Sequence, residues 1–123
     1  ADLAWTRLTG WRETVARIFA SPEERHRCAA VETIRMEYRG EVPSTGAWYL
    51  AAWMRSAFPN AVTHLEASPA NRNRILIGGQ ACQEVSIESP DGVGAEIRVD
   101  GRSFYTMFSP DSEKQLMHEE LSI

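Results

Sequence analysis

The sequence has few cysteines, few histidines and no long apolar run. Its two cysteines, Cys28 and Cys82, are far apart in the chain, so no paired spacing indicates a zinc site or a redox dithiol. The three histidines fit no metal-ligand motif, and we predict no metal and no cofactor. The most apolar stretch, Ala47 to Met54, is much shorter than the roughly 18 residues of a membrane span, so we expect no membrane association.

Excess positive charge is missing as well. The formal net charge is −4 and the pI is about 5.4, which gives no overall field to attract a phosphate backbone. We therefore expect no nucleic-acid partner. The basic residues are arginines except for Lys114. Arginine favours bidentate contacts with carboxylates or phosphates, although the same bias is typical of an ordinary solvated surface.

The length of 123 residues, with 43% hydrophobic and 24% charged residues, predicts one globular domain over 1–123. Apolar residues three and four positions apart, together with capping residues, predict four helices. Thr9 is the expected cap of the first helix, and Ser44 or Thr45 that of the third. The four helices are expected at about 10–20, 22–29, 45–58 and from 110 onward.

Residues of alternating polarity predict strands at 31–38, 62–67, 74–77, around Val85 and Ile87, and at 93–99 and 102–108. The order strand, helix, strand over 31–67 predicts a right-handed parallel crossover. Turn residues such as Asp100-Gly101 predict antiparallel hairpins for the remainder. The fold class is therefore α+β: a mixed sheet of five or six strands with one parallel β-α-β crossover, antiparallel hairpins and helices mainly on one face.

The residues that could bind phosphate or act in catalysis fit structural roles better. Gly78 and Gly79 follow a strand without a phosphate-binding motif, which favours a strand end. The carboxylates of Glu84, Glu88 and Glu96 fall on outward strand positions, where a solvated face is more usual than a glycosidase-like pair. We predict no catalytic residue. The helix at 45–58 is apolar nearly all round, which favours enclosure in the core over an exposed docking face.

Tryptophan and arginine gather at the start of the chain. All four tryptophans lie in the first 53 residues, close to several arginines. These two residue types dominate the hot spots of protein interfaces. We predict that a partner protein is bound by Trp5, Arg7, Trp11 and Arg12. The alternative is that these residues build the core of the domain itself.

Several segments carry a family resemblance, among them the strand expected at 31–38 and the segments that follow here. The string from Asp2 to Glu13, in which two tryptophans flank Arg-Leu-Thr, resembles the second half of OpcA, the glucose-6-phosphate dehydrogenase assembly protein family. The segments Ala47 to Met54 and Gln115 to Leu121 are similar to a small-residue helix and to the closing helix of that family. Family members are longer, so the resemblance implies that this chain is the C-terminal part of an OpcA-like protein.

The resemblance also implies a function. It indicates a non-enzymatic, cytoplasmic partner of glucose-6-phosphate dehydrogenase that favours the active oligomer of that enzyme. An alternative from the residues alone is a sensor of a small ligand such as a sugar phosphate, bound by Arg72 and Arg74. An enzyme whose site is assembled from dispersed carboxylates and histidines also stays open, because a sequence does not show which side chains converge in space.

Overall fold

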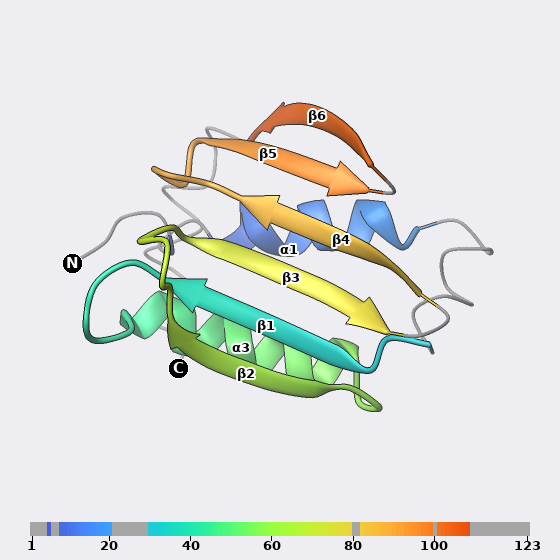
Figure 1. Cartoon of the computed structure of the whole chain (residues 1–123), viewed down its shortest axis with the longest axis horizontal. Coiled ribbons are helices and arrows are strands. Elements are labelled where there is room, and N and C mark those ends of the chain that lie inside the picture. Colours follow the sequence, from blue (N-terminus) through green and yellow to red (C-terminus); the bar gives the residue numbers. More distant parts are fainter. Residues whose placement is uncertain (1–4, 6–7, 21–29, 80–81, 100, 109–123) are drawn as a thin grey trace.

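The computed structural model describes residues 5, 8–20, 30–79, 82–99 and 101–108. Two helices and six strands lie in this part of the chain (Figure 1). In chain order they are α1 (Leu8–Ile18), β1 (Thr33–Tyr38), α3 (Thr45–Ala57), β2 (Val62–Ala67), β3 (Arg74–Gly79), β4 (Cys82–Glu88), β5 (Gly94–Val99) and β6 (Arg102–Met107).

The strands form one sheet in the order β2-β1-β3-β4-β5-β6. Strands β1 and β2 are parallel, with Thr33 opposite Val62, and α3 connects them as the predicted crossover. The other four neighbouring pairs are antiparallel. The predicted α+β fold with a mixed sheet is confirmed. At the end of β3 the register shifts between Ile77 and Gly79, so the glycine pair does mark an irregular strand end.

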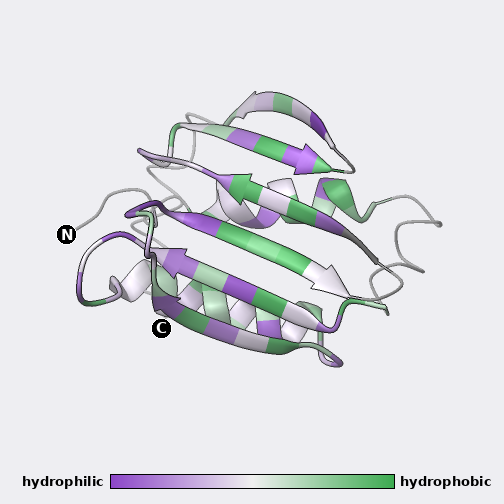
Figure 2. Cartoon of the chain, in the orientation of Figure 1, coloured by the Kyte–Doolittle hydropathy of each residue, from purple (hydrophilic) through white to green (hydrophobic). Residues whose placement is uncertain are grey.

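Both helices lie on the same face of the sheet (Figure 1). The alternation along the strands, visible as changes of hydropathy in Figure 2, turns one set of side chains toward the helices. In β1 this set includes Ile34 and Met36, which are fully buried, whereas Thr33 and Arg35 are exposed on the other face. We call the side with the helices the covered face and the opposite side the open face.

The crossover helix α3 is held at its start by a side-chain cap and by close packing. Ser44 is the N-cap: its hydroxyl oxygen accepts a hydrogen bond from the backbone N–H of Ala47 at 3.2 Å. A Cβ atom at Gly46 would overlap with the carbonyl oxygen of Trp5, so only glycine allows the helix to approach that backbone. Leu50 and Met54 then bury their side chains against the sheet.

Some sequence predictions need correction. Helix α1 begins at Leu8 rather than Gly10, and Thr9 lies inside it, because Leu8 is drawn into the core. Strand β3 continues to Gly79, two residues beyond its predicted end. Full enclosure of the third predicted helix is wrong for Trp48, which is 54% exposed because α3 packs on the sheet with one side only. The helices predicted at 22–29 and from 110 onward lie outside the described residues.

Candidate functional site

The two tryptophans of the predicted contact set, Trp5 and Trp11, lie inside the core. Both side chains are fully buried. Their rings are stacked with centroids 4.5 Å apart, and Phe108 meets the ring of Trp11 edge-on at 5.4 Å. Aromatic pairs in these geometries stabilise a fold beyond the effect of the area they bury. The position of both residues therefore fits the alternative in which they build the domain's own core.

A buried asparagine connects Trp5 to distant parts of the chain. The Oδ1 atom of Asn73 accepts hydrogen bonds from the indole N–H of Trp5 and from the backbone N–H of Arg39, each at 2.9 Å. The backbone carbonyl of Asn73 accepts a third, from the N–H of Ser89 at 3.1 Å. Asn73 thus holds together Trp5, which lies three residues before α1, and the residues that follow β1 and β4. Sequence analysis missed this role, because a lone asparagine in a loop gives no signal of it.

The two arginines of the contact set have different outcomes. Arg7 lies outside the described residues. Arg12 is half-buried on α1, next to the buried Trp11 and the exposed Glu13. The structure therefore brings Trp5 and Trp11 together but turns them away from solvent, and leaves only Arg12 of the described members partly accessible. Contact of the four residues with a partner stays a prediction.

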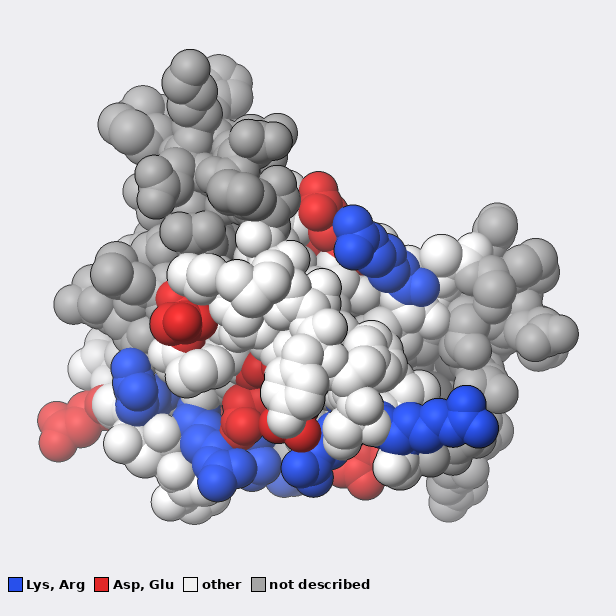
Figure 3. Space-filling model, turned by 90° about the horizontal axis from the view of Figure 1, so that it is seen from above, with Lys and Arg blue, Asp and Glu red and all other residues white. Residues whose placement is uncertain are grey.

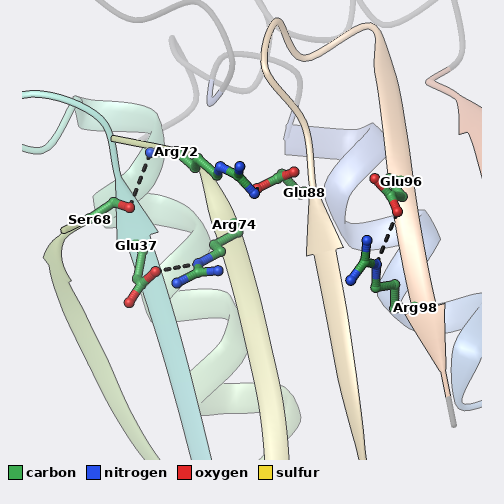
Figure 4. A network of polar contacts seen from close by, with 7 residues as sticks. All are labelled: Glu37, Ser68, Arg72, Arg74, Glu88, Glu96 and Arg98. Carbon is green, nitrogen blue, oxygen red and sulfur yellow. Dashed lines mark hydrogen bonds and ion pairs between the residues drawn. The ribbon is translucent and has the colours of Figure 1, made fainter. Parts of the chain in front are cut away.

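The open face of the sheet carries pairs of opposite charge (Figure 4). Arg74 and Glu37 form an ion pair across β3 and β1, and Glu37 is only 2% exposed. Glu88 and Glu96 stand directly opposite each other on β4 and β5, but each has an arginine of its own. The pairs Arg72–Glu88 and Arg98–Glu96 measure 3.4 and 3.0 Å, and the pair Arg35–Glu66 measures 2.9 Å.

In this geometry Glu88 and Glu96, two of the carboxylates considered in the sequence analysis, have a structural role. Because each of Glu88 and Glu96 has its own arginine, the repulsion expected of like charges directly opposite in a sheet is offset. Glu84 is exposed, as its outward position predicted. Among the residues that the structure describes, no group of three or more His, Cys, Asp or Glu is placed to hold a metal ion.

Comparison with known families decides the assignment. The model of the OpcA family, described as the C-terminal domain of a glucose-6-phosphate dehydrogenase subunit, matches residues 1–122. The chain belongs to this family. The match confirms the resemblance inferred from the sequence and links the domain to glucose-6-phosphate dehydrogenase. Comparisons with curated proteins and with solved structures found no match.

In this OpcA domain, two of the segments that carry the resemblance meet in the core. The opening segment contributes Trp5 and Trp11, and the segment from Ala47 to Met54 forms most of α3. They approach each other at Gly46, the residue just before the second segment, which leaves room for the backbone of Trp5. The uncommon tryptophan spacing that identified the family therefore reflects, in the described part of the segment, the packing of α1 and α3 on the sheet.

The arginines proposed for sugar-phosphate binding in the OpcA domain both have carboxylate partners. Arg74 pairs with Glu37, and Arg72 with Glu88. A small pocket of about 280 Å³ next to Arg72 is also lined by Arg39, Asn73 and Glu88. An incoming phosphate would compete there with the carboxylate already paired to Arg72, which disfavours anion binding. Sugar-phosphate binding stays a prediction.

Exposed apolar side chains of the OpcA domain gather on strand β6. Phe104, Tyr105 and Met107 are 47%, 78% and 69% exposed. Seen from above, with the β6 side of the sheet toward the viewer, the middle of the surface is largely uncharged and charged side chains lie around it (Figure 3). The available signal in the sequence was the hairpin turn expected at Asp100-Gly101 before the strand expected at 102–108, but the sequence analysis drew no functional conclusion from it.

No helix in the described ranges of the OpcA domain combines the length and the apolar character that a membrane crossing requires.

Proposed function

We propose that this OpcA domain is a non-enzymatic assembly module that binds glucose-6-phosphate dehydrogenase and favours the active oligomer of that enzyme. The observation that carries the proposal is the family match over residues 1–122, whose description names a subunit of this dehydrogenase. The description as a C-terminal domain supports the expectation that residues 1–123 form one domain of a longer protein. Action in the cytoplasm belongs to the same proposal.

The mechanism is thermodynamic linkage between binding and assembly. A module that binds the assembled enzyme more tightly than the dissociated enzyme shifts that equilibrium by the ratio of the two affinities. Each tenfold ratio corresponds to about 1.4 kcal/mol in favour of assembly. No chemical step by the module is needed. In support of this, Glu88 and Glu96, the two neighbouring carboxylates of the sheet, each form an ion pair with an arginine.

Within this proposal the predicted contact residues divide into two roles. Arg12, half-buried on α1, and Arg7 contact the enzyme, with guanidinium groups suited to carboxylates on its surface. Trp5 and Trp11 act indirectly, because their stacked rings and the Trp5–Asn73 hydrogen bond hold α1 in place against the sheet. Loss of either tryptophan would displace Arg12 as well as weaken the fold.

Size-exclusion chromatography with light scattering tests the proposal directly. The chain is mixed with glucose-6-phosphate dehydrogenase of the same organism, and enzyme activity is measured in the same fractions. We expect co-elution with a larger and more active oligomer. Absence of co-elution would contradict enzyme binding, and co-elution without a change in oligomer size would contradict the linkage mechanism.

A pair of arginine variants tests the contact surface. Arg12→Ala is expected to weaken enzyme binding at least tenfold, whereas Arg55→Ala, which removes an exposed arginine at the end of α3, leaves it unchanged. Circular dichroism establishes that both variants are folded. Equal binding by the Arg12 variant and the unaltered chain would show that the enzyme contacts another part of the domain.

A further inference from the structure

The strand at one edge of the sheet, β6, lacks the protection that edge strands usually have. The sheet order places β6 at one end and β2 at the other. Exposed strand edges can pair with further chains, and natural proteins guard them with charged residues, bulges or prolines. Strand β6 contains neither proline nor an acidic residue, and its single charged residue, Arg102, is its first. Its middle exposes Phe104 and Tyr105.

The opposite edge, β2, is guarded. It carries His64 and Glu66 in its interior, and Glu66 forms an ion pair with Arg35 of the neighbouring strand β1. Leu65 is partly buried against the core, so the apolar part of this strand is already engaged. The two edges therefore differ in charge and in apolar exposure, and only β6 presents an uncharged central segment.

The backbone of β6 shows which of its groups face outward. Just after β6, the N–H of Phe108 donates a hydrogen bond to the carbonyl of Val93 at 2.7 Å. The pairing of β5 with β6 continues from there, with Gly94 opposite Met107 and Ile97 opposite Phe104. In an antiparallel pair, hydrogen-bonded and non-hydrogen-bonded positions alternate. Phe104 therefore directs its N–H and C=O toward β5, as do the other even-numbered residues of β6. The groups of the odd-numbered residues point away from the sheet: Ser103, Tyr105 and Met107.

We propose that β6 is a self-association surface at which a second copy of this chain pairs antiparallel with the first, about a twofold axis at Tyr105. In this register Tyr105 faces its own counterpart and Ser103 faces Met107 of the other copy. Every outward-facing residue then meets another outward-facing residue, and each such pair exchanges two backbone hydrogen bonds. A shift of the register by one residue, which moves the axis by half a residue, places outward groups opposite groups already bonded to β5.

The side chains are also self-complementary in this register. On the open face Met107 lies opposite the smaller Ser103, and on the covered face Phe104 lies opposite the smaller Thr106. The two Arg102 residues lie at opposite ends of the new strand pair, roughly 20 Å apart at about 3.4 Å per residue, so they do not repel each other. Apart from the pair of Tyr105 rings at the axis, large side chains lie opposite small ones and no like charges are opposed. These features favour a second copy as the occupant of this edge.

A groove between α1 and the edge strand adds apolar surface to the same interface. It has a volume of about 280 Å³, and its lining includes Ile18, Ile97 and Phe104. Phe104 of the second copy would lie beside its opening. Six residues of strand bury less than the about 800 Å² per partner of a standard interface, so the expected dissociation constant is on the order of 10 to 100 μM.

Sedimentation velocity of the chain alone, over a concentration series, tests the proposal without the enzyme. We expect the dimer fraction to rise with concentration. Tyr105→Lys places two like charges face to face at the twofold axis and should weaken the dimer at least tenfold. The matched control is Val62→Lys, which adds a lysine at an exposed position of the β2 edge and should leave the dimer intact. Circular dichroism establishes that both variants are folded.

Cysteine cross-linking tests the register. Residues opposite each other in a hydrogen-bonded antiparallel pair have Cα atoms about 5.5 Å apart, which is within disulfide range. In a background with Cys28→Ser and Cys82→Ser, Tyr105→Cys should form a disulfide-linked dimer under mild oxidation, whereas Val62→Cys should not.

Three results would overturn the proposal. One is a chain that remains monomeric up to about 500 μM, well above the expected dissociation constant. Another is a dimer that Tyr105→Lys does not weaken. The third is a monomeric chain in which Tyr105→Lys instead abolishes enzyme binding, because the edge would then pair with the enzyme. Dimerisation is measured on the chain alone. A negative result would therefore contradict the dimer without contradicting the proposed binding of the enzyme, which has a separate test.

Discussion

The covered and open faces of the sheet are built from alternate residues of the same strands, yet different forces stabilise them. The covered face buries apolar side chains such as Ile34, Ile75 and Ile87 completely under the helices. Burial contributes roughly 25 cal/mol for each Å² of apolar area. The open face carries ion pairs such as Arg98–Glu96, and exposed pairs contribute at most about 1 kcal/mol. Most of the folding free energy therefore comes from the covered face.

Glu37 is an exception to this division, because it is a buried residue on the open face. It belongs to the open face by strand alternation, but it is 2% exposed and ion-paired with Arg74. A buried carboxylate needs its partner much more than an exposed one does, because an uncompensated buried charge is costly. The open face thus has a largely buried charge pair between β1 and β3, and more exposed charge pairs on β1–β2 and on β5.

The largest expected effect comes from the aromatic core of the covered face. Trp11→Ala removes a fully buried ring that stacks on Trp5 and meets Phe108, and it should lower the free energy of unfolding by about 3–5 kcal/mol. Trp48→Ala, at an exposed position of α3, should cost less than about 1 kcal/mol. Urea unfolding followed by circular dichroism measures both, and equal losses would contradict the assignment of Trp11 to the core.

The next effect tests the buried pair on the open face. Arg74→Met leaves the carboxylate of Glu37 without its partner and should cost about 3 kcal/mol. Glu37→Gln should cost about 1–2 kcal/mol, because the side chain of Arg74 is 28% exposed and its charge can reach water. The same unfolding measurement decides the order. A larger loss of stability for Glu37→Gln than for Arg74→Met would show that the arginine, rather than the carboxylate, is the charge that depends more on its partner.

Two glycines distinguish close packing on the covered face from open space. Gly46→Ala forces a Cβ atom against the carbonyl of Trp5 and should cost about 2 kcal/mol, because backbone cannot move aside as a flexible side chain can. Gly78→Ala meets nothing within 4 Å and should change stability by less than about 0.5 kcal/mol. Thermal unfolding of the two variants checks this. A neutral Gly46→Ala would mean that α3 does not approach Trp5 this closely.

The smallest effect is expected from the solvated pairs of the open face. Arg98→Ala and Arg35→Ala should each change the free energy of unfolding by less than about 0.5 kcal/mol, because both arginines are more than half exposed. Unfolding at low and at high salt should give nearly the same difference from the unaltered chain. A loss above about 1 kcal/mol from either variant would mean that these pairs are more important to the fold than their exposure indicates.

Much of the fold could be predicted because it depends on local patterns. The alternation in β1 and the Ser44 cap of α3 are properties of neighbouring residues, and both predictions are confirmed. The parallel pairing of β1 with β2 followed from the strand, helix, strand order. Helix α1 was placed two residues late, because burial of Leu8 extends the helix past the predicted Thr9 cap.

The candidate site was much less predictable. Tryptophan and arginine together indicated an interface, but the same residues suit a core, and both possibilities stayed open in the sequence. The orientation of Trp5 depends on Asn73, which lies 68 residues away and accepts its indole hydrogen bond. The exposure of Trp48 depends on how α3 packs, since periodicity alone did not distinguish its outer side.

The amino-acid pattern alone determined the class of fold, the parallel crossover and the family, because these depend on periodicity, chain order and residue spacing. Only the tertiary structure decided which side chains face solvent. It turned Trp5 and Trp11 inward, paired Glu37 with Arg74, and left Tyr105 on an exposed edge. The physical reason is that burial and ion pairing depend on residues distant in the chain, and their positions are set by the sheet order and the packing of both helices together.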